Sequence, residues 1–425
     1  MKRLKLRQRC AWEVVFAALL LVLIDIFPPQ LMVVLVLWGL IFLSVLFVDP
    51  RKKTLLAGSI VGVLLALNLV LPYFMQTTYY RPYERLRKIH SRGFRRYAPN
   101  QDVVVERSHG DLLAVGFRHP EVQELKQTRS LQFVTDRYGY RNTTVLPEYD
   151  LILIGDSFVA GNGNSQDDTI SEALGKHGLR SYNLGHAGNI AEYIRSFQSA
   201  DKEMEVSGRR IVFVFEGNDF RGRDYCVDEI AFFVRLRRYH RLLRELHISR
   251  FISAISSKFS IVAADTSPAI TVKALPDGRK MGFFNEYLNA ALETSFNGKC
   301  LENLLQRAED AIAMLVFIPT KARTYSFLFE DPQSNLNGVS IYSRESSRIA
   351  AKLGIPYLDL TEPLRTRSMS LLPAGKLTFW RDDSHWNPEG IRAAADVIAL
   401  ALKKTSITSH EDRTAAPVDS RSNER

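Results

Sequence analysis

The chain of 425 residues has few cysteines and no cysteine motif. Cys10, Cys226 and Cys300 form neither a C-x-x-C pair nor a zinc-binding spacing, which excludes a small disulfide-stapled scaffold and a usual structural zinc site. The sequence has no internal repeat, and 46% of its residues are apolar against 24% charged, which excludes collagen and global disorder. At ~150 residues per domain, the length allows two or three domains.

The positive charge is unevenly distributed: the chain has 56 Lys and Arg against 46 Asp and Glu. Residues 1–75 hold eight basic and three acidic residues, so half of the formal net charge of +10 falls there. The remaining residues carry the other half of the net positive charge, which is a mild excess for their number. No nucleic-acid-binding motif is present. We therefore expect no nucleic-acid partner.

Uncharged apolar runs dominate the first 75 residues. Residues 14–27 are apolar except for Asp25, and residues 31–48 and 54–75 carry no charge. A helix of 18 residues reaches about 27 Å, close to the ~30 Å hydrocarbon core of a bilayer. The pattern predicts a membrane anchor of three transmembrane helices at 1–75. The alternative, a signal peptide followed by buried helices, fits less well, because a signal peptide has one short apolar run.

Basic residues flank the first two predicted helices on one side. Five precede the first helix, Arg51, Lys52 and Lys53 follow the second, and the turn at 28–30 has none. The positive-inside rule then places the domain from residue 76 onward outside the cytoplasm, as in a multi-pass protein of the inner (cytoplasmic) membrane with a periplasmic domain. There Cys226 and Cys300 could form a disulfide, with two free thiols as the alternative. A basic run after the third helix could contact anionic lipid headgroups; it comprises Arg81, Arg85, Arg87, Lys88, Arg92, Arg95 and Arg96.

Short apolar runs alternate with helical segments in the rest of the chain. We expect strands at 131–135, 151–154, 181–184, 211–215, 313–318 and 355–360, and helices at 169–176, 191–200 and 391–402. This alternation predicts an α/β fold with a parallel sheet covered on both faces, in which ligands bind at the carboxyl ends of strands. The expected organisation is a basic, irregular lead-in at 76–130, an α/β domain at 131–403 with a helical insertion at about 225–310, and a disordered tail at 404–425.

Polar motifs follow three of these strands. Ser157 closes the Gly155-Asp156-Ser157 sequence, where a strand-to-helix turn can expose its hydroxyl beside helix N-terminal amides. Gly188 follows the next strand and can bring a backbone N–H close to a substrate oxygen, and Asn218 follows the third and offers an amide donor for an oxyanion. Each motif taken alone is more typical of a turn or helix cap than of a catalytic site.

A fourth motif surrounds His385, just before the last predicted helix. Asp382 and Asp383 lie three and two residues before it, and Trp380 and Trp386 flank the stretch. An imidazole can take a proton from a serine when a carboxylate holds its other ring nitrogen. The alternative is a surface histidine. The two flanking tryptophans argue against full exposure, so this alternative fits the sequence less well.

The set of four motifs resembles the SGNH/GDSL hydrolase superfamily over about residues 133–402. The signature blocks correspond to Gly155-Asp156-Ser157, Gly188, Gly217-Asn218-Asp219 and the Asp-containing stretch ending in His385, with Phe158 where leucine is usual. The runs 317–321 and 383–386 look like membrane-linked members that acetylate or deacetylate polysaccharides. The resemblance implies a three-layer α/β/α sandwich with a five-stranded parallel sheet, and no metal or organic cofactor.

The resemblance also implies roles for the site residues. Ser157 would be the nucleophile and His385 the general base, and the oxyanion hole would use the N–H groups of Ser157 and Gly188 and the Asn218 amide. Asp383 is favoured over Asp382 as the carboxylate that orients His385, because a tryptophan follows the histidine. The expected protein is an esterase or O-acyltransferase acting on an acylated carbohydrate or lipid-linked glycan, beside membrane lipid and polysaccharide-assembly proteins. The alternative is a non-catalytic glycan-binding or assembly protein of a polysaccharide export complex.

Overall fold

The structure, a computed structural model, describes residues 81–90, 94–115, 119–188, 190–220, 269–307, 312–329 and 336–414. The three transmembrane helices expected within 1–75 lie outside these residues. Among the helices that are described, none is long and apolar enough to span a bilayer.

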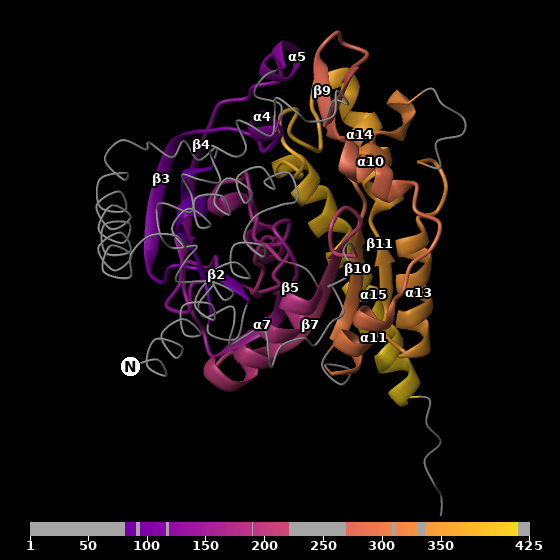
Figure 1. The fold of residues 1–425 in the computed structure, drawn as a ribbon. Helices are drawn as coiled ribbons and strands as arrows, with labels where there is room; N and C mark the ends of the chain where they lie inside the picture. The colour runs from indigo at the N-terminus through magenta and orange to yellow at the C-terminus, as the bar shows by residue number, and fades with distance from the viewer. Residues whose placement is uncertain are drawn as a thin grey trace, which may run out of the picture. The chain divides into compact units, whose positions relative to one another are not determined.

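Five parallel strands form the central sheet (Figure 1). In the order in which they lie side by side, they are β11 (Tyr357–Asp359), β10 (Ile312–Ile318), β7 (Ser207–Phe215), β5 (Glu148–Ile154) and β6 (Ser181–Asn183). The predicted parallel five-stranded sheet is therefore confirmed. Because β5 lies between β6 and β7, the residues that follow these three strands meet at one edge of the sheet.

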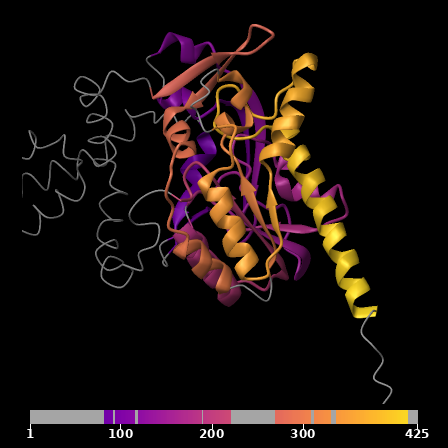
Figure 2. The same ribbon diagram turned by 90° about the vertical axis from the view of Figure 1, so that its right-hand side faces the viewer.

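Helices cover both faces of the sheet. Successive residues of a strand point to opposite faces, and in β7 Ile211 and Phe213 belong to one apolar cluster while Val212 and Val214 belong to another. The first cluster includes α6 (Ile170–Gly175), α14 (Thr361–Leu371) and α15 (Pro388–Thr414); the second includes α7 (Ile190–Glu203), α11 (Lys299–Gln306) and α13 (Ile341–Lys352). Figure 2 shows α13 and α15 on opposite sides of the sheet. The domain is thus a three-layer α/β/α sandwich.

The segment before the sheet is folded, whereas an irregular lead-in was expected at 76–130. It contains a 3-10 helix, η2 (Pro82–Leu86), the strands β1 (Arg87–Ile89), β2 (Arg95–Tyr97) and β3 (Gln101–Ser108), and the short helices α4 (Leu112–Val115) and α5 (Pro120–Gln123). Strand β3 pairs antiparallel with β4 (Arg129–Thr135). Widely spaced aromatic residues explain the difference, because Tyr83 and Tyr97 are buried against Phe133 of β4 although no apolar run surrounds them in the chain. The folded domain therefore begins before residue 131.

Two further segments differ from expectation. The described part of the predicted helical insertion begins with a hairpin, β8 (Ile270–Ala274) and β9 (Lys280–Phe284), before α10 (Asn285–Ala291) and α11. Gly278, with a φ of 81°, lies in the turn between the two strands, a conformation that glycine adopts without strain. Helix α15 continues to Thr414 instead of ending at residue 403, since no glycine or proline interrupts residues 404–414.

Cys300 lies on α11, is 3% exposed and is disulfide-bonded. Cys10 and Cys226, the two residues with which it could pair, lie outside the described residues. The Cys226–Cys300 pairing stays a prediction.

Candidate active site

Ser157 follows the carboxyl end of β5, in a turn that the preceding residue holds. The carboxylate of Asp156 accepts a hydrogen bond from the backbone N–H of Phe158 (2.8 Å), and its carbonyl accepts one from Ala160 (3.0 Å). Asp156 is buried, and this burial raises its pKa to about 6. Ser157 itself is only partly buried, so its side chain is accessible. The backbone of the turn that carries it is fixed by the bonds of Asp156.

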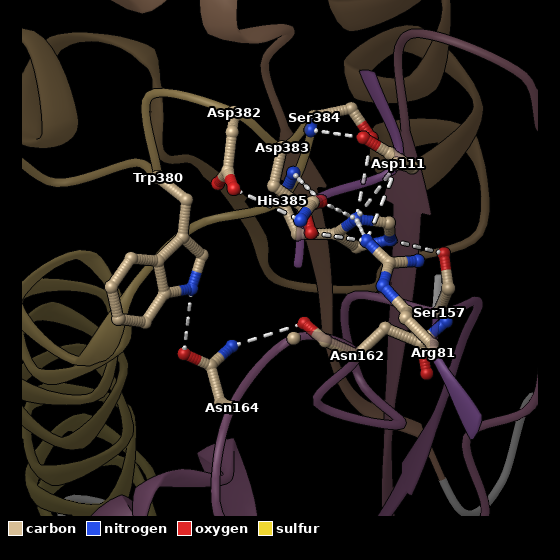
Figure 3. Close-up of polar contacts among 12 residues, drawn as sticks. Arg81, Asp111, Ser157, Asn162, Asn164, Trp380, Asp382, Asp383, Ser384 and His385 are labelled. Atoms are coloured by element: carbon tan, nitrogen blue, oxygen red, sulfur yellow. Dashed lines mark hydrogen bonds and ion pairs between the residues drawn. The ribbon is translucent and has the colours of Figure 1, made fainter. Parts of the chain in front are cut away.

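His385 connects Ser157 to a carboxylate (Figure 3). Its Nε2 atom lies 2.7 Å from Oγ of Ser157, and its Nδ1 atom lies 2.7 Å from Oδ1 of Asp383. The backbone N–H of His385 donates to the same Oδ1 atom at 3.1 Å. With the proton on Nδ1, the ring donates to Asp383 and accepts from the serine hydroxyl, which is the arrangement that a general base requires.

Asp382 faces away from the His385 ring. Its Oδ2 atom accepts hydrogen bonds from the backbone N–H groups of Gly110 (3.0 Å) and Gln127 (2.9 Å), and its Oδ1 atom accepts from Nη1 of Arg129 (2.9 Å). Of the two carboxylates that the sequence offers, the structure brings Asp383 to the ring and uses Asp382 to attach the loop to the lead-in segment.

Two arginines neutralise the second oxygen of Asp383. Oδ2 accepts a hydrogen bond from Nη2 of Arg129 (2.9 Å) and another from Nη2 of Arg81. Burial by itself would raise the pKa of Asp383, but Arg81, the hydrogen bond from His385 and Arg129 together hold that pKa well below its usual range. The carboxylate is therefore ionised although its side chain is fully buried.

Opposing groups set the basicity of His385. Burial and the nearby Arg81 guanidinium lower its pKa, whereas hydrogen bonding to Asp111 and Asp383 raises it, and the net effect is a pKa above the ordinary 6.5. The Phe158 ring lies 4.7 Å from the imidazole, measured between centroids, and Trp386 packs edge-on against Phe158. The phenylalanine that replaces the usual leucine thus forms an apolar wall beside the base.

Lys321 fixes the loop that carries the base. It begins α12 (Lys321–Thr324), directly after β10, and its Nζ atom donates to the carbonyl oxygens of Trp380 (2.6 Å), Arg381 (3.2 Å) and Asp383 (3.0 Å). Burial lowers the pKa of Lys321 to about 7. Since unpaired buried carbonyl groups are costly, this one side chain holds three carbonyl groups of the loop backbone in place.

The two candidate oxyanion-hole residues follow the strands on either side of β5, the strand that precedes Ser157. Gly188 follows β6 and Asn218 follows β7, the two neighbours of β5, and both residues are partly exposed. Next to Asn218, the buried Asp219 carboxylate accepts hydrogen bonds from the hydroxyl of Tyr193 (2.6 Å) and the backbone N–H of Phe215 (2.7 Å). These bonds fix the turn that carries Asn218, while its role as an oxyanion donor stays a prediction.

Asp111, Asp383 and His385 offer ligand atoms within 4.8 Å of one another, the kind of cluster that could hold a metal ion. The guanidinium of Arg81 donates to Asp383 and lies 3.5 Å from Oδ2 of Asp111. A metal ion would therefore face a fixed positive charge, so this cluster fits an arginine better than a metal.

Four residues of the site were missed in the sequence. Arg81 is one of several residues in a basic run, and nothing in that run distinguishes it. No local pattern distinguishes Asp111 or Arg129, because their partners in the loop before His385 lie more than 250 residues away. Lys321 was within the 317–321 run that supported the resemblance, but nothing in its spacing indicated a contact with the loop at 380–383. Only the assembled fold brings these charges together.

A Ser–His–Asp line at the carboxyl ends of parallel strands, in an α/β/α sandwich, is the arrangement that the resemblance to the SGNH superfamily implies. The comparisons agree: the family model described as "SGNH hydrolase-like domain, acetyltransferase AlgX" matches residues 299–423, which contain Lys321, Asp383 and His385 but not Ser157. The resemblance to this superfamily is therefore confirmed. No curated protein matches the chain.

Two solved structures share low sequence identity with the chain. A member of the lipolytic protein G-D-S-L family from Veillonella parvula DSM 2008 is 15% identical, with 58% of this chain and 93% of that chain covered and a TM-score of 0.29. LAE5, an alpha/beta hydrolase enzyme from the metagenome of Lake Arreo, Spain, is 14% identical, with 60% and 95% covered and a TM-score of 0.33.

Proposed function

We propose that the chain is a membrane-anchored serine esterase or O-acyltransferase that acts on ester-linked acyl groups, acetyl above all, of an envelope glycan. The observation that carries this proposal is the hydrogen-bonded line from Ser157 through His385 to Asp383, with two contacts of 2.7 Å. The acetyltransferase description of the matching family supports acyl transfer.

The first half of the reaction would form an acyl-enzyme. Oγ of Ser157 attacks the acyl carbonyl carbon while its proton passes to Nε2 of His385. The N–H groups of Ser157 and Gly188 and the Asn218 amide would stabilise the negative carbonyl oxygen. When the ester bond breaks, the imidazolium gives its proton to the departing alcohol oxygen, and the acyl group remains on the serine.

The second half distinguishes the two activities. His385 takes a proton from an incoming hydroxyl group, which attacks the acyl carbonyl carbon. The bond between that carbon and Oγ then breaks, and Oγ regains the proton from the imidazolium, which restores the free serine. Water as the acceptor would make the protein an esterase, and a sugar hydroxyl would make it an O-acyltransferase. Both use the same side chains, so the acceptor decides the activity.

The glycan substrate is inferred from the sequence. The three apolar runs and their basic flanks support a domain outside the cytoplasm, where an acylated carbohydrate or lipid-linked glycan would be the available ester, near membrane lipid and polysaccharide-assembly proteins.

Alkaline phosphatase fused after Thr78 should be active. An inactive fusion, combined with an active cytoplasmic reporter at the same residue, would contradict this placement.

Labelling with a fluorophosphonate tests the chemistry. The wild-type protein should be labelled and the Ser157→Ala variant should not. The purified chain should also hydrolyse an aryl acetate, and added oligosaccharide would reveal a transferase by forming an acylated sugar. Absence of both labelling and turnover would favour a non-catalytic glycan-binding or assembly protein of an export complex.

A further inference from the structure

Arg81 is the first described residue and lies six positions after Met75, where the last N-terminal apolar run ends. It belongs to the basic run for which contact with lipid headgroups was expected. Its side chain is instead 4% exposed and lies beside the reacting groups (Figure 3). The lipid-contact interpretation is therefore wrong for Arg81.

Arg81 completes the coordination of the Asp383 carboxylate. Oδ1 accepts hydrogen bonds from Nδ1 (2.7 Å) and the backbone N–H (3.1 Å) of His385, while Oδ2 accepts from Arg81 and from Arg129 (2.9 Å). Rotation of this buried carboxylate would break charge-assisted bonds on both sides. By binding one oxygen, the two arginines therefore fix the orientation of the carboxylate and hold its other oxygen toward the imidazole.

Arg129 cannot replace Arg81 in this arrangement. Its Nη1 atom is bonded to Asp382 (2.9 Å), its Nε atom donates to the carbonyl of Gly163 (3.1 Å), and its guanidinium lies over the ring of Trp380 at 4.3 Å. These contacts fix the Arg129 guanidinium in place, so it cannot move to the position beside the histidine without breaking them.

Arg81 also acts on His385 directly. Its Nη2 atom lies 3.2 Å from Nδ1 of the ring, closer than Oδ2 of Asp111 at 3.5 Å. Nδ1 already donates to Asp383, so it cannot accept from the arginine, and the contact sets a positive charge against the ring. A cation in this place disfavours the protonated imidazolium. Among the described residues, the charged or titratable groups around the ring are Asp383, Asp111, Arg81, Ser157 and Asp156.

We propose that Arg81 is a positioning residue of the acyl-transfer site, which holds Asp383 toward His385 and favours the neutral imidazole between turnovers. The inference rests on the proposed acyl-transfer function, and it makes the segment directly after the N-terminal apolar region a part of the active site.

The test compares full-length wild-type protein with Arg81→Met and Arg81→Ala in an aryl acetate assay across pH. Arg95→Met is the matched control, since Arg95 belongs to the same basic run, is 50% exposed and pairs with Glu192 at 3.5 Å. Arg81→Met should lower kcat/KM about 100-fold and move the acid limb of its pH profile upward by about 1 pH unit. Ethylguanidinium should restore part of the activity of Arg81→Ala. Arg95→Met should change neither quantity.

Titration of the His385 ring by NMR gives a readout that needs no turnover. The His385 signal, assigned with His385→Gln, should titrate at higher pH in Arg81→Met than in wild type. Equal titration in the two proteins, or an activity loss without a shifted pH limb and without rescue, would overturn the inference. A wild-type protein that fluorophosphonate does not label would contradict acyl transfer, whereas the titration would still decide the effect of Arg81.

Discussion

Asp382 and Asp383 are neighbours in the chain, yet their carboxylates face different partners: Asp383 contacts Nδ1 of His385 at 2.7 Å, and Asp382 binds backbone N–H groups of the lead-in segment. Asp382 lies in a turn and Asp383 in the bend that follows it. The loop thereby uses one carboxylate for chemistry and the other for attachment, and the two can be separated by mutation.

Asp383→Asn and Asp382→Asn should have different effects. The first change preserves shape but favours the wrong histidine tautomer, so kcat should fall about 10⁴-fold, as it does in a serine protease. The second removes charge-assisted bonds and should lower the free energy of unfolding by about 1.5–3 kcal/mol, with a smaller loss of kcat. Steady-state kinetics and urea unfolding of both variants test this. The reverse ranking in kcat would assign the orienting role to Asp382.

Gly110→Ala should damage the site from a distance in sequence. A Cβ atom at residue 110 would lie 1.7 Å from the carbonyl oxygen of Asp382, so the loop would have to move. We expect a loss of kcat/KM of about 100-fold, measured by aryl acetate hydrolysis. Gly175→Ala is the control, because a Cβ there meets no atom within 4 Å and its helix should gain stability. Equal activity of the two variants would show that the loop tolerates the displacement.

The pH profile of kcat/KM should have an acid limb above pH 6.5. The base must be neutral to accept the serine proton, and the pKa of His385 is raised above 6.5 mainly through Asp111 and Asp383, against burial and Arg81. The same raised pKa contributes stability below pH 6.5, which is lost as the pH rises through the folded-state value. A limb at or below 6.5 would mean that the two carboxylates do not outweigh burial and Arg81.

Lys321→Met should change the pH dependence of stability. The pKa of Lys321 is about 7 in the folded chain against an ordinary 10.5, so the unfolded chain binds more protons between these values and stability rises with pH there. The methionine variant should lose this rise and also leave three loop carbonyls without their donor. Lys280→Met, at a lysine that is 47% exposed, is the control. Urea unfolding at pH 7 and about pH 9 measures the difference. The same change in the free energy of unfolding between these pH values in wild type and Lys321→Met would contradict it.

The sheet could be predicted because its central strands, β5, β7 and β10, are buried on both faces and therefore stand out as short apolar runs. The nucleophile and the base could be predicted because each follows such a run or precedes a helix within a recognisable motif. In both cases, the signal is local: the strand, the turn and the functional side chain lie within a few residues of one another.

The charges around the base could not be predicted, since their partners are remote in sequence. Arg81 contacts a carboxylate 302 positions away, and Arg129 contacts one 253 positions away. The lead-in was missed for a related reason: its core consists of isolated aromatic residues such as Tyr83 and Tyr97, which produce no periodic pattern. Burial of a charge depends on the full set of counter-charges, and only the tertiary structure supplies that set.

The contacts of the lead-in have a consequence for how the chain can be divided. In the described residues, Asp382 takes its hydrogen bonds from Gly110, Gln127 and Arg129, and Arg81 and Arg129 are the cations on Asp383. Residues 81–130 thus contact the α/β domain in the way that a bound peptide contacts its receptor. A cut before β5 would leave Ser157, His385 and Asp383 on one fragment and Arg81, Asp111 and Arg129 on the other. The two fragments should regain activity when mixed and lose it on dilution, as a complemented enzyme does.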